Sequence, residues 1–401
     1  MGYNINFEKK QICFVMNLFD TGLGIIYSLG PMEIPTIGLD FNRVMPGFKS
    51  RYCNAFICPH PVHQAEELLQ FLLKEGKKLS NPGILFPASD IFVIFLSKFR
   101  DELKSCFHFI LPSQEVIEAI VNKKKQYELA ERAEIPYPKT FYPRNFDDIY
   151  KINKNLNYPV FIKPIYSYKW QEKFQGIKGF KVDNSEELES RFRQIHSASI
   201  EVMIQEIIPG PNTNHYKANV YINKKNELLA LFTLRKIRQY PVEFGVGSCV
   251  ESINYEELKE LGLKFFKGIN YQGVGSIEFK KDERDGKLKL IELNPRYWQQ
   301  SYLATVCGIN FPLIQYLDLT GQNPEPQTKF KIGVKWLDLI ADFQSFWDYF
   351  SQHRLTPWQW FKSLKGVKSI ANFALDDLGP FLETVEYGWK FMKMPLYLLR
   401  H

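Results

Sequence analysis

The stretch SIEFKKDERDGKLKLIELNPR, residues 276–296, restricts the fold of this chain more than any other segment. Two runs of alternating apolar and polar residues flank the turn sequence at 284–286, and this pattern predicts a β-hairpin. Only a register that pairs Glu278 with Glu292 matches apolar side chains across the two strands. The hydrophobic pattern therefore sets two glutamates side by side on the other face of the hairpin.

Two neighbouring carboxylates repel each other by about 3 kcal/mol at ~5 Å and an effective dielectric constant of ~20. With the amide oxygen of Asn294, Glu278 and Glu292 offer hard oxygen ligands that suit Mg²⁺ or Mn²⁺ better than zinc. Because Mg²⁺ often shares its shell with phosphates, a nucleoside triphosphate is the natural companion. The alternative is an exposed hairpin face whose charges are screened by Lys280 and Arg296.

Composition limits the classes of protein that remain possible. A chain of 401 residues exceeds the ~250 residues at which single cores stop growing, so we expect two or three domains. The net charge of +7 comes from dispersed residues, and we expect no nucleic-acid partner. Six cysteines without metal-type spacing, and no run of ~18 apolar residues, predict a cytoplasmic protein without a membrane span.

Residues 1–112 alternate short apolar strands with helical segments, which predicts a Rossmann-like, doubly wound parallel sheet. Gly22 and Gly24 resemble part of a dinucleotide-binding loop, but the third glycine is misplaced, and a plain strand-to-helix turn is favoured. Ser89 and Asp90 end the strand in GILFPASD, at the sheet edge where ligands usually bind. We expect them to face the acceptor substrate, and a helix cap is the alternative.

The pattern changes twice after residue 112. Residues 113–325 combine helices with strands joined by polar turns, which predicts an α+β unit, and residues 326–401 form a helical, aromatic-rich extension. Four apolar residues of this extension share helical spacing: Ile340, Phe343, Trp347 and Phe350. We expect this face to pack on the preceding domain. Interfacial membrane attachment by residues 387–401 is the less favoured alternative.

Taken in order, these pieces resemble the ATP-grasp superfamily across about residues 12–320, the fold of biotin carboxylase, carbamoyl phosphate synthetase and D-alanine ligase. The resemblance implies two α+β lobes that clasp ATP, preceded by a pre-ATP-grasp domain. In that superfamily the acidic residue of a strand like GSIEF and the pair in IELNPR bind the metal ions. The resemblance thus assigns Mg²⁺ or Mn²⁺ to Glu278, Glu292 and Asn294.

Three further segments match parts of the nucleotide site in that superfamily. NKKKQYELAERAEIPYP implies that Lys123 contacts phosphate, and YPVFIKP implies the same for Lys163. IQEIIPG resembles the linker between the lobes, near 205–210, and implies adenine binding by Gln205, Glu206, Ile207 and Ile208. The alternatives are a solvated helix face for Lys123 and a simple strand and turn for IQEIIPG. Lys163 is more telling, because an unpaired lysine in an apolar strand is costly.

The chain departs from the superfamily in the loop over the phosphates. Residues 165–180, IYSYKWQEKFQGIKGF, hold only two glycines, yet a lid with Lys178 near the phosphates is expected. Arg235 is predicted to bind an anion beside the nucleotide, and a solvated strand position is the alternative. Trp298 and Gln299 stand where smaller residues often follow the metal-binding strand. We expect them to narrow the acceptor pocket.

The resemblance implies an ATP- and Mg²⁺-dependent carboxylate–amine ligase of the branch related to D-aspartate ligases, with small-molecule carboxylate and amine substrates. A carboxylate attacks the γ-phosphate to give an acylphosphate, and an amine then displaces phosphate. Lys163 and Arg296 are the predicted catalytic residues, Arg296 binding the transferring phosphate or the acceptor carboxylate. The alternative is a nucleotide-binding regulatory or scaffold protein without turnover, although two facing carboxylates favour an enzyme.

Overall fold

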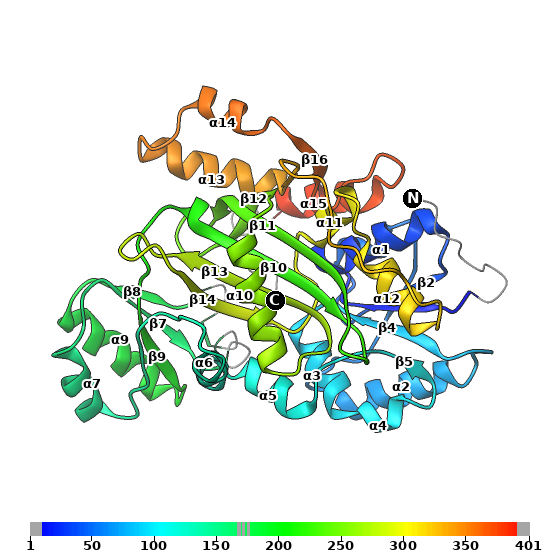
Figure 1. The fold of residues 1–401 in the computed structure, drawn as a ribbon, viewed down its shortest axis with the longest axis horizontal. Helices are drawn as coiled ribbons and strands as arrows, with labels where there is room; N and C mark the ends of the chain where they lie inside the picture. The colour runs from blue at the N-terminus through cyan, green and yellow to red at the C-terminus, as the bar shows by residue number, and fades with distance from the viewer. Residues whose placement is uncertain (1–9, 167–169, 171–172, 175–176, 391–401) are drawn as a thin grey trace.

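A computed structural model describes residues 10–166, 170, 173–174 and 177–390 (Figure 1). The predicted lid of residues 165–180 therefore lies partly outside the described residues. The first sheet is parallel, with strand order β3-β2-β1-β4-β5, and this confirms the predicted doubly wound arrangement. Its strands are β1 Cys13–Met16, β2 Thr36–Asp40, β3 Asn54–Ile57, β4 Gly83–Pro87 and β5 Phe107–His108.

Helices cover both faces of this sheet, because its strands are apolar on both sides. Cys13 and Val15 face α1 (Asp20–Leu29), whereas Phe14 and Met16 face the opposite helix layer. That layer consists of α2 Ala65–Gly76, α3 Asp90–Lys98 and α4 Arg100–Leu103. Strands β1 and β4 are thus buried throughout, as their apolar sequence runs predict, whereas the edge strand β3 is mostly exposed.

A four-stranded antiparallel sheet, order β6-β9-β7-β8, forms the smaller lobe. Its strands are β6 Thr140–Phe141, β7 Val160–Pro164, β8 Phe180–Val182 and β9 Val202–Glu206. Helices α7 Phe146–Asn153 and α9 Ser185–Ser197 pack on it through Ile149, Leu188 and Phe192. Helices α5 Gln114–Val121 and α6 Lys123–Arg132 lead into this lobe. Asn122 caps α6 by accepting the backbone N–H groups of Lys124 and Lys125, which fixes the start of that helix.

The largest sheet has seven strands in the order β14-β13-β10-β11-β12-β15-β16. They are β10 His215–Ile222, β11 Leu228–Tyr240, β12 Val246–Ser252, β13 Gly273–Lys281, β14 Leu288–Asn294, β15 Lys335–Leu337 and β16 Val367–Ile370. Strands β13 and β14 form the predicted hairpin, and Glu278 pairs with Glu292 as its register requires. Ile277 and Phe279 face α10 (Glu256–Gly268), so both glutamates lie on the other face.

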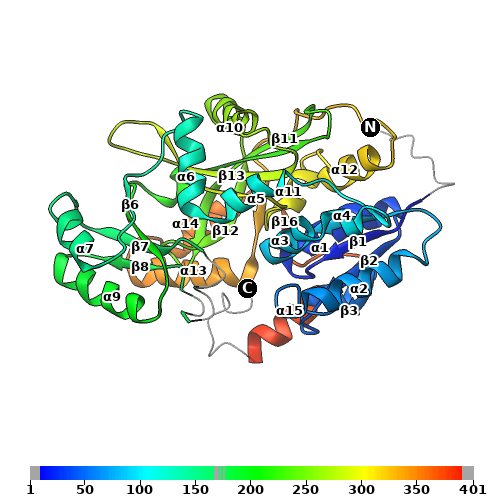
Figure 2. The same cartoon turned by 90° about the horizontal axis from the view of Figure 1, so that it is seen from below.

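One continuous core joins the first sheet to the seven-stranded sheet. Helices α11 Ser301–Val306 and α12 Phe311–Leu319 lie between them, and α1 contacts both helices. Trp298 belongs to this core, where it is 2% exposed and contacts Phe311 edge to face at 5.2 Å between ring centroids. Trp298 thus supports the junction between the two sheets. Figure 2 shows the seven-stranded sheet between the smaller lobe and the N-terminal sheet.

The C-terminal extension contains α13 Leu339–Ser351, α14 Pro357–Ser363 and α15 Gly379–Lys390. It also supplies β15 and β16 to the largest sheet, so the prediction of a purely helical extension is incomplete. Helix α13 contacts β11 and β12, but its predicted packing face was wrong. Phe343, Trp347 and Phe350 are exposed, and the helix packs through the face of Ala341, Asp342, Ser345, Phe346 and Tyr349.

In the described part of the chain, every helix is too short or too polar to cross a bilayer. The segment 387–401, considered for interfacial attachment, is described only as the last turn of α15, up to Lys390. Residues 391–401 lie outside the described residues.

Candidate active site

The paired glutamates lie where two strands, β10 and β11, bring basic side chains to the same face of the largest sheet. Glu278 Oε1 accepts hydrogen bonds from Lys236 Nζ at 2.7 Å and from His215 Nδ1 at 3.0 Å. Its Oε2 lies 3.4 Å from Lys217 Nζ. Lys217 stands opposite Glu278 in the β10–β13 ladder, and Glu292 stands on its other side in β14. The sheet register therefore places Lys217, Glu278 and Glu292 side by side on neighbouring strands.

These contacts keep Glu278 ionised. Burial by itself would raise the pKa of this carboxyl, but the ammonium groups of Lys236 and Lys217 hold the pKa well below its usual value. Burial lowers the pKa of His215 to about 4, so its imidazole is neutral at pH 7. Because an ionised carboxylate only accepts, Nδ1 of His215 donates this hydrogen bond.

Glu292 is paired with Lys123, whose Nζ lies 2.6 Å from Glu292 Oε1. Burial would raise the pKa of Glu292, but Lys123 brings the pKa down to about 2. Burial would likewise lower the pKa of Lys123, and Glu292 raises it overall. The Lys123 side chain is only 13% exposed, so it is not part of a solvated helix face.

Two more lysines surround the carboxylates, and both have lowered pKa values. Burial, and then the charge of Lys123, lower the pKa of Lys163 to about 7, and its Nζ lies 3.3 Å from the hydroxyl of Tyr127. Loss of hydration, and then the charge of Lys236, lower the pKa of Lys178 to about 8. The carboxylates in this cluster thus carry too little negative charge to stabilise all the ammonium groups.

The cluster is therefore cationic overall. Its two acidic residues, Glu278 and Glu292, face five lysines: Lys123, Lys163, Lys178, Lys217 and Lys236. A site with this surplus is suited to bind a polyanion. The lowered pKa values indicate that further negative charge would stabilise the protonated lysines.

Asn294 lies on the same face, two residues after Glu292 and opposite Ser276 in the β13–β14 ladder. Among the described residues, no group of three His, Cys, Asp or Glu side chains is placed to hold a metal. Two ionised carboxylates and one amide oxygen nevertheless match the donors that Mg²⁺ takes when phosphates complete its shell. The residues present thus fit the predicted ion.

Arg296 connects this face to the N-terminal sheet. Its guanidinium binds Asp90 through two hydrogen bonds, Nε to Oδ1 at 2.7 Å and Nη2 to Oδ2 at 3.1 Å. Asp90 is the first residue of α3, directly after the carboxyl edge of β4. Ser89, beside it, has a buried hydroxyl that contacts no hydrogen-bonding partner among the described residues. Asp90 thus fixes the guanidinium just beyond the end of β14.

The predicted adenine segment runs from the end of β9 toward the largest sheet. Gln205 is buried and donates from Nε2 to Thr140 Oγ1 at 2.8 Å. Glu206 accepts from the backbone N–H of Lys139 at 2.8 Å and from Arg284 Nη2 at 2.9 Å. Ile207 is partly buried and Ile208 is buried at 3% exposure. These contacts tie the hairpin to the smaller lobe at this segment.

Arg235 does not join the cluster. Its guanidinium binds Glu251 Oε2 on β12 at 2.8 Å and 3.0 Å. In the β10–β11 ladder Arg235 pairs with Tyr216, and the Tyr216 side chain packs against the hydrophobic core under α10. Strand alternation therefore places Arg235 on the opposite face from Lys236, and Lys236 supplies the charge expected of Arg235.

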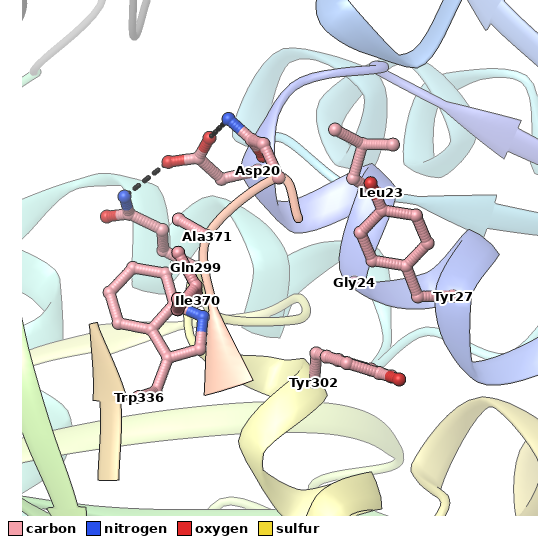
Figure 3. A pocket seen from close by; sticks show the side chains of 10 residues that line it. Asp20, Leu23, Gly24, Tyr27, Gln299, Tyr302, Trp336, Ile370 and Ala371 are labelled. Carbon is pink, nitrogen blue, oxygen red and sulfur yellow. Dashed lines mark hydrogen bonds between the residues drawn. The ribbon is translucent and has the colours of Figure 1, made fainter. Parts of the chain in front are cut away.

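Gln299 joins the site region to the two ends of the chain. Its Nε2 donates to Asp20 at the start of α1, and Asp20 Oδ1 accepts from Asn372 Nδ2 at 2.8 Å (Figure 3). A small pocket lies beside these residues, lined also by Tyr27 and Tyr302. Its walls come from α1, α11 and the C-terminal strands, so Gln299 contributes to a junction between the three parts of the chain.

Sequence reasoning missed His215 and Lys217 as members of the cluster. Both stand in HYKANVYI, where polar residues alternate with Tyr216, Ala218 and Val220. That period of two marks a strand with one polar face. It could have identified the two residues, but it does not reveal that the polar face lies against Glu278.

Comparisons with known proteins concern residues 122–316 and the fold. Residues 122–316 match the family described as Carbamoyl-phosphate synthase L chain, ATP binding domain. D-aspartate ligase from Enterococcus faecium (strain Aus0004) is 26% identical over 279 residues, which are 66% of this chain and 65% of the ligase. The chain thus spans slightly less than two thirds of that relative, and smaller shares of others, such as 49% of the 2-oxoglutarate carboxylase small subunit.

Two solved structures have a similar fold. N5-carboxyaminoimidazole synthetase from Staphylococcus aureus, complexed with ADP, has a TM-score of 0.64 and 15% identity, with 86% of each chain covered. The biotin carboxylase domain of 2-oxoglutarate carboxylase from Hydrogenobacter thermophilus, in complex with MgADP, ADP and bicarbonate, has a TM-score of 0.62 and 17% identity. That match covers 81% of this chain and 73% of the carboxylase domain. At these identities the similarity concerns the fold.

Proposed function

We propose that this chain is an ATP- and Mg²⁺-dependent carboxylate–amine ligase with the ATP-grasp fold. The match of residues 122–316 to an ATP-binding domain family and the similar fold of an ADP-bound synthetase support this proposal. The reaction activates a small-molecule carboxylate as an acylphosphate and joins it to an amine, releasing ADP and phosphate. The relative named D-aspartate ligase supports a carbon–nitrogen ligase. The identities of the carboxylate and the amine are left open in this proposal.

The surplus of lysines around the glutamate pair is the observation that carries the proposal. Lys163 and Lys178 have pKa values lowered to about 7 and about 8 because they are desolvated among other cations. The phosphates of ATP would supply the missing negative charge and return both lysines to their protonated forms. A triphosphate accompanied by Mg²⁺ therefore matches the cluster in charge.

Glu278, Glu292 and Asn294 would hold Mg²⁺, which when bound would neutralise phosphate charge. Both carboxylates are ionised at pH 7, because Lys236 and Lys123 hold their pKa values low despite burial. They are thus ready to act as ligands without losing a proton. In this proposal the two lysines exchange their carboxylate partners for phosphate oxygens when the nucleotide binds.

The protein's own contribution to phosphoryl transfer is position and charge. Lys123 and Lys163 offset the negative charge on the phosphates, and Lys178 approaches them from the predicted lid. Gln205, Glu206, Ile207 and Ile208 form the proposed contact surface for adenine, at the connection between the smaller lobe and the hairpin.

Arg296 is the proposed contact for the transferring phosphate or for the carboxylate substrate. A guanidinium has five N–H donors, and three of the hydrogen bonds of Arg296 go to Asp90 and the Tyr297 carbonyl. The remaining donors would bind the anionic substrate. Because Asp90 fixes the plane of the guanidinium, this contact needs little reorganisation at the moment of reaction.

Phosphate release tests the proposal. Purified protein with MgATP is supplied with pairs of amino acids and small carboxylic acids, and hydroxylamine is added to trap any acylphosphate as a hydroxamate. We expect release of phosphate and hydroxamate that depends on one carboxylate. Glu292→Gln should abolish this release, whereas Glu260→Gln, an exposed glutamate on α10, should leave it unchanged. Release by Glu292→Gln at the parent rate would refute the site assignment.

The regulatory alternative gives a different result in the same experiment. A nucleotide-binding scaffold would bind ADP and ATP with loss of affinity in Glu292→Gln, but no carboxylate would stimulate phosphate release. Binding without stimulated release across the whole panel would therefore favour the alternative and contradict the proposed ligase.

A further inference from the structure

Helix α13 presents an apolar face to solvent. Leu339, Phe343, Trp347 and Phe350 recur at helical spacing and are 41%, 53%, 59% and 41% exposed. Isolated exposed apolar residues are ordinary on soluble proteins, but a complete exposed stripe of large side chains indicates an interaction surface.

The stripe continues onto α14. Trp358 and Phe361 on that helix are 77% and 62% exposed. Trp360 connects the two helices, because its ring stacks on Phe346 of α13 at 4.9 Å and meets Phe361 at 5.0 Å between centroids. We call Phe343, Trp347, Phe350, Trp358 and Phe361 the aromatic surface. Figure 1 shows α13 and α14 along one outer side of the molecule, away from the N-terminal sheet.

This exposure follows from how α13 is anchored. Asp342, on its buried face, accepts hydrogen bonds from Arg238 Nε and Nη2, each at 2.8 Å, and from Trp360 Nε1 at 2.9 Å. Asp342 is 0% exposed and Arg238 is 4% exposed. A buried ion pair of this kind is orientation-specific, so α13 cannot rotate to bury its aromatic face without breaking the pair.

Basic residues predominate in the segment that follows α13, although the partly exposed Asp348 of α13 and the exposed Glu243 lie near the aromatic surface. Residues 349–375 contain no aspartate or glutamate and four basic residues: Arg354, Lys362, Lys365 and Lys368. All four basic side chains are on exposed residues. Tryptophan and phenylalanine beside lysine and arginine are the residues that bind the interface of a bilayer rich in anionic lipids. We propose that the aromatic surface docks this protein on the headgroup region of an anionic membrane.

Two other occupants fit the charges less well. A second copy of the chain would bring a second set of the same basic residues against the first, which is repulsive. Residues 391–401 contain Lys393 and Arg400 and no acidic residue, so their charge is positive like that of the surface they would cover, which is also repulsive. An anionic lipid surface is complementary to both the apolar and the basic residues.

Vesicle co-sedimentation of the full chain tests this inference. We expect binding to vesicles of phosphatidylcholine mixed with phosphatidylglycerol, little binding to phosphatidylcholine alone, and release by salt. The triple variant Trp347→Ser, Trp358→Ser, Phe361→Ser should lose at least about ten-fold in partitioning, since each large side chain contributes on the order of 1–3 kcal/mol when buried. Phe56→Ser, an equally exposed aromatic on β3 (53%), is the matched control and should bind like the parent.

A second set of variants tests the charges separately. Each of Lys362→Gln, Lys365→Gln and Lys368→Gln should lower partitioning roughly five-fold, the equivalent of ~1 kcal/mol per basic residue near an anionic surface. The controls are Lys74→Gln on α2 and Lys77→Gln directly after that helix, and both lysines are exposed. All surface variants should retain the parent circular dichroism spectrum and melting temperature, which separates lost docking from lost folding.

Three results would overturn the inference. The first is no binding of the parent to either vesicle, or equal binding to both. The second is binding that survives the triple aromatic variant but disappears when the chain is truncated after Lys390, because residues 391–401 would then be the anchor. The third is a dimer in sedimentation equilibrium that Trp347→Ser dissociates, because the surface would then bind a second copy.

Discussion

Replacing Asp342 with asparagine tests how the C-terminal extension is attached to the seven-stranded sheet. Asp342 Oδ1 accepts from Arg238 Nε at 2.8 Å and from Ser248 Oγ at 3.0 Å, and Oδ2 accepts from Arg238 Nη2 and from Trp360 Nε1. Asparagine keeps the size of the side chain but replaces one acceptor oxygen with an NH₂ group. That group would face donors only, and Arg238 would remain buried without a counter-charge.

The structure indicates that this substitution strongly destabilises the fold. Removing one partner of a buried ion pair destabilises a protein by about 3–5 kcal/mol, because the remaining charge is uncompensated. Asp342 is fully buried and Arg238 nearly so, so little solvent screening reduces this value. We therefore expect Asp342→Asn to lower the free energy of unfolding of the extension by about 3–5 kcal/mol. Asp348→Asn, on a partly exposed position of the same helix, should change it by less than about 0.5 kcal/mol.

Urea unfolding followed by tryptophan fluorescence reports on this region, because five of the seven tryptophans lie in residues 326–401. Hydrogen exchange of α13 would show whether the extension unfolds before the rest of the chain. We expect Asp342→Asn to affect the lysine cluster as well. In the β11–β12 ladder, Arg238 is the next paired residue after Lys236, and the register shifts between the two. If Asp342→Asn and Asp348→Asn unfold at the same urea concentration, the assigned role of the buried pair is wrong.

Three further predictions concern the lysine cluster and Arg296. Because the pKa of Lys163 is about 7, a growing share of this lysine is neutral as pH rises through about 7, and nucleotide binding should then take up a proton. Titration calorimetry in buffers of different ionisation enthalpy measures this uptake, and Lys163→Arg should reduce it. The lowered pKa of Glu292 stabilises the folded protein at pH values above about 4.3, the pKa of a glutamate in the unfolded chain. This contribution is lost as the pH falls toward about 2, the pKa of Glu292 in the folded protein. Lys123→Met should remove that acid-sensitive part of stability, and an unchanged acid-unfolding curve would contradict the pairing. The lysine of Arg296→Lys cannot form the two parallel hydrogen bonds that Arg296 donates to Asp90, so kcat/KM for the carboxylate substrate should fall about ten-fold or more. A parent-like kcat/KM would exclude Arg296 from substrate binding.

The hairpin register and the parallel sheet could be predicted because both follow from local alternation. Burial of Ile277 favours the register that places Glu278 opposite Glu292, whereas the irregularity after Glu278, which pairs Phe279 with Leu290, does not follow from alternation. The structure further shows that Lys123 reaches Glu292, although a row of three lysines at a helix start does not reveal such a contact. Residues that act within one hairpin are thus easier to identify than residues that meet across the fold.

Other features depend on contacts between distant segments. Lys217 reaches Glu278 only because β10 pairs with β13, some 60 positions later in the chain, and no local pattern specifies that pairing. The face of α13 was wrongly predicted because amphipathic reasoning buries aromatic residues and exposes aspartate. Here Arg238 compensates the charge of Asp342, which allows the polar face to pack and leaves Phe343 in solvent.

Binding of Mn²⁺ in the presence of ADP, followed by electron paramagnetic resonance, tests the central assignment most directly. We expect a ternary complex in the parent, at least about ten-fold weaker binding in the double variant Glu278→Gln, Glu292→Gln, and parent-like binding in Glu260→Gln. Parent-like Mn²⁺ affinity in the double variant would contradict the proposal that the paired glutamates form the metal–nucleotide site.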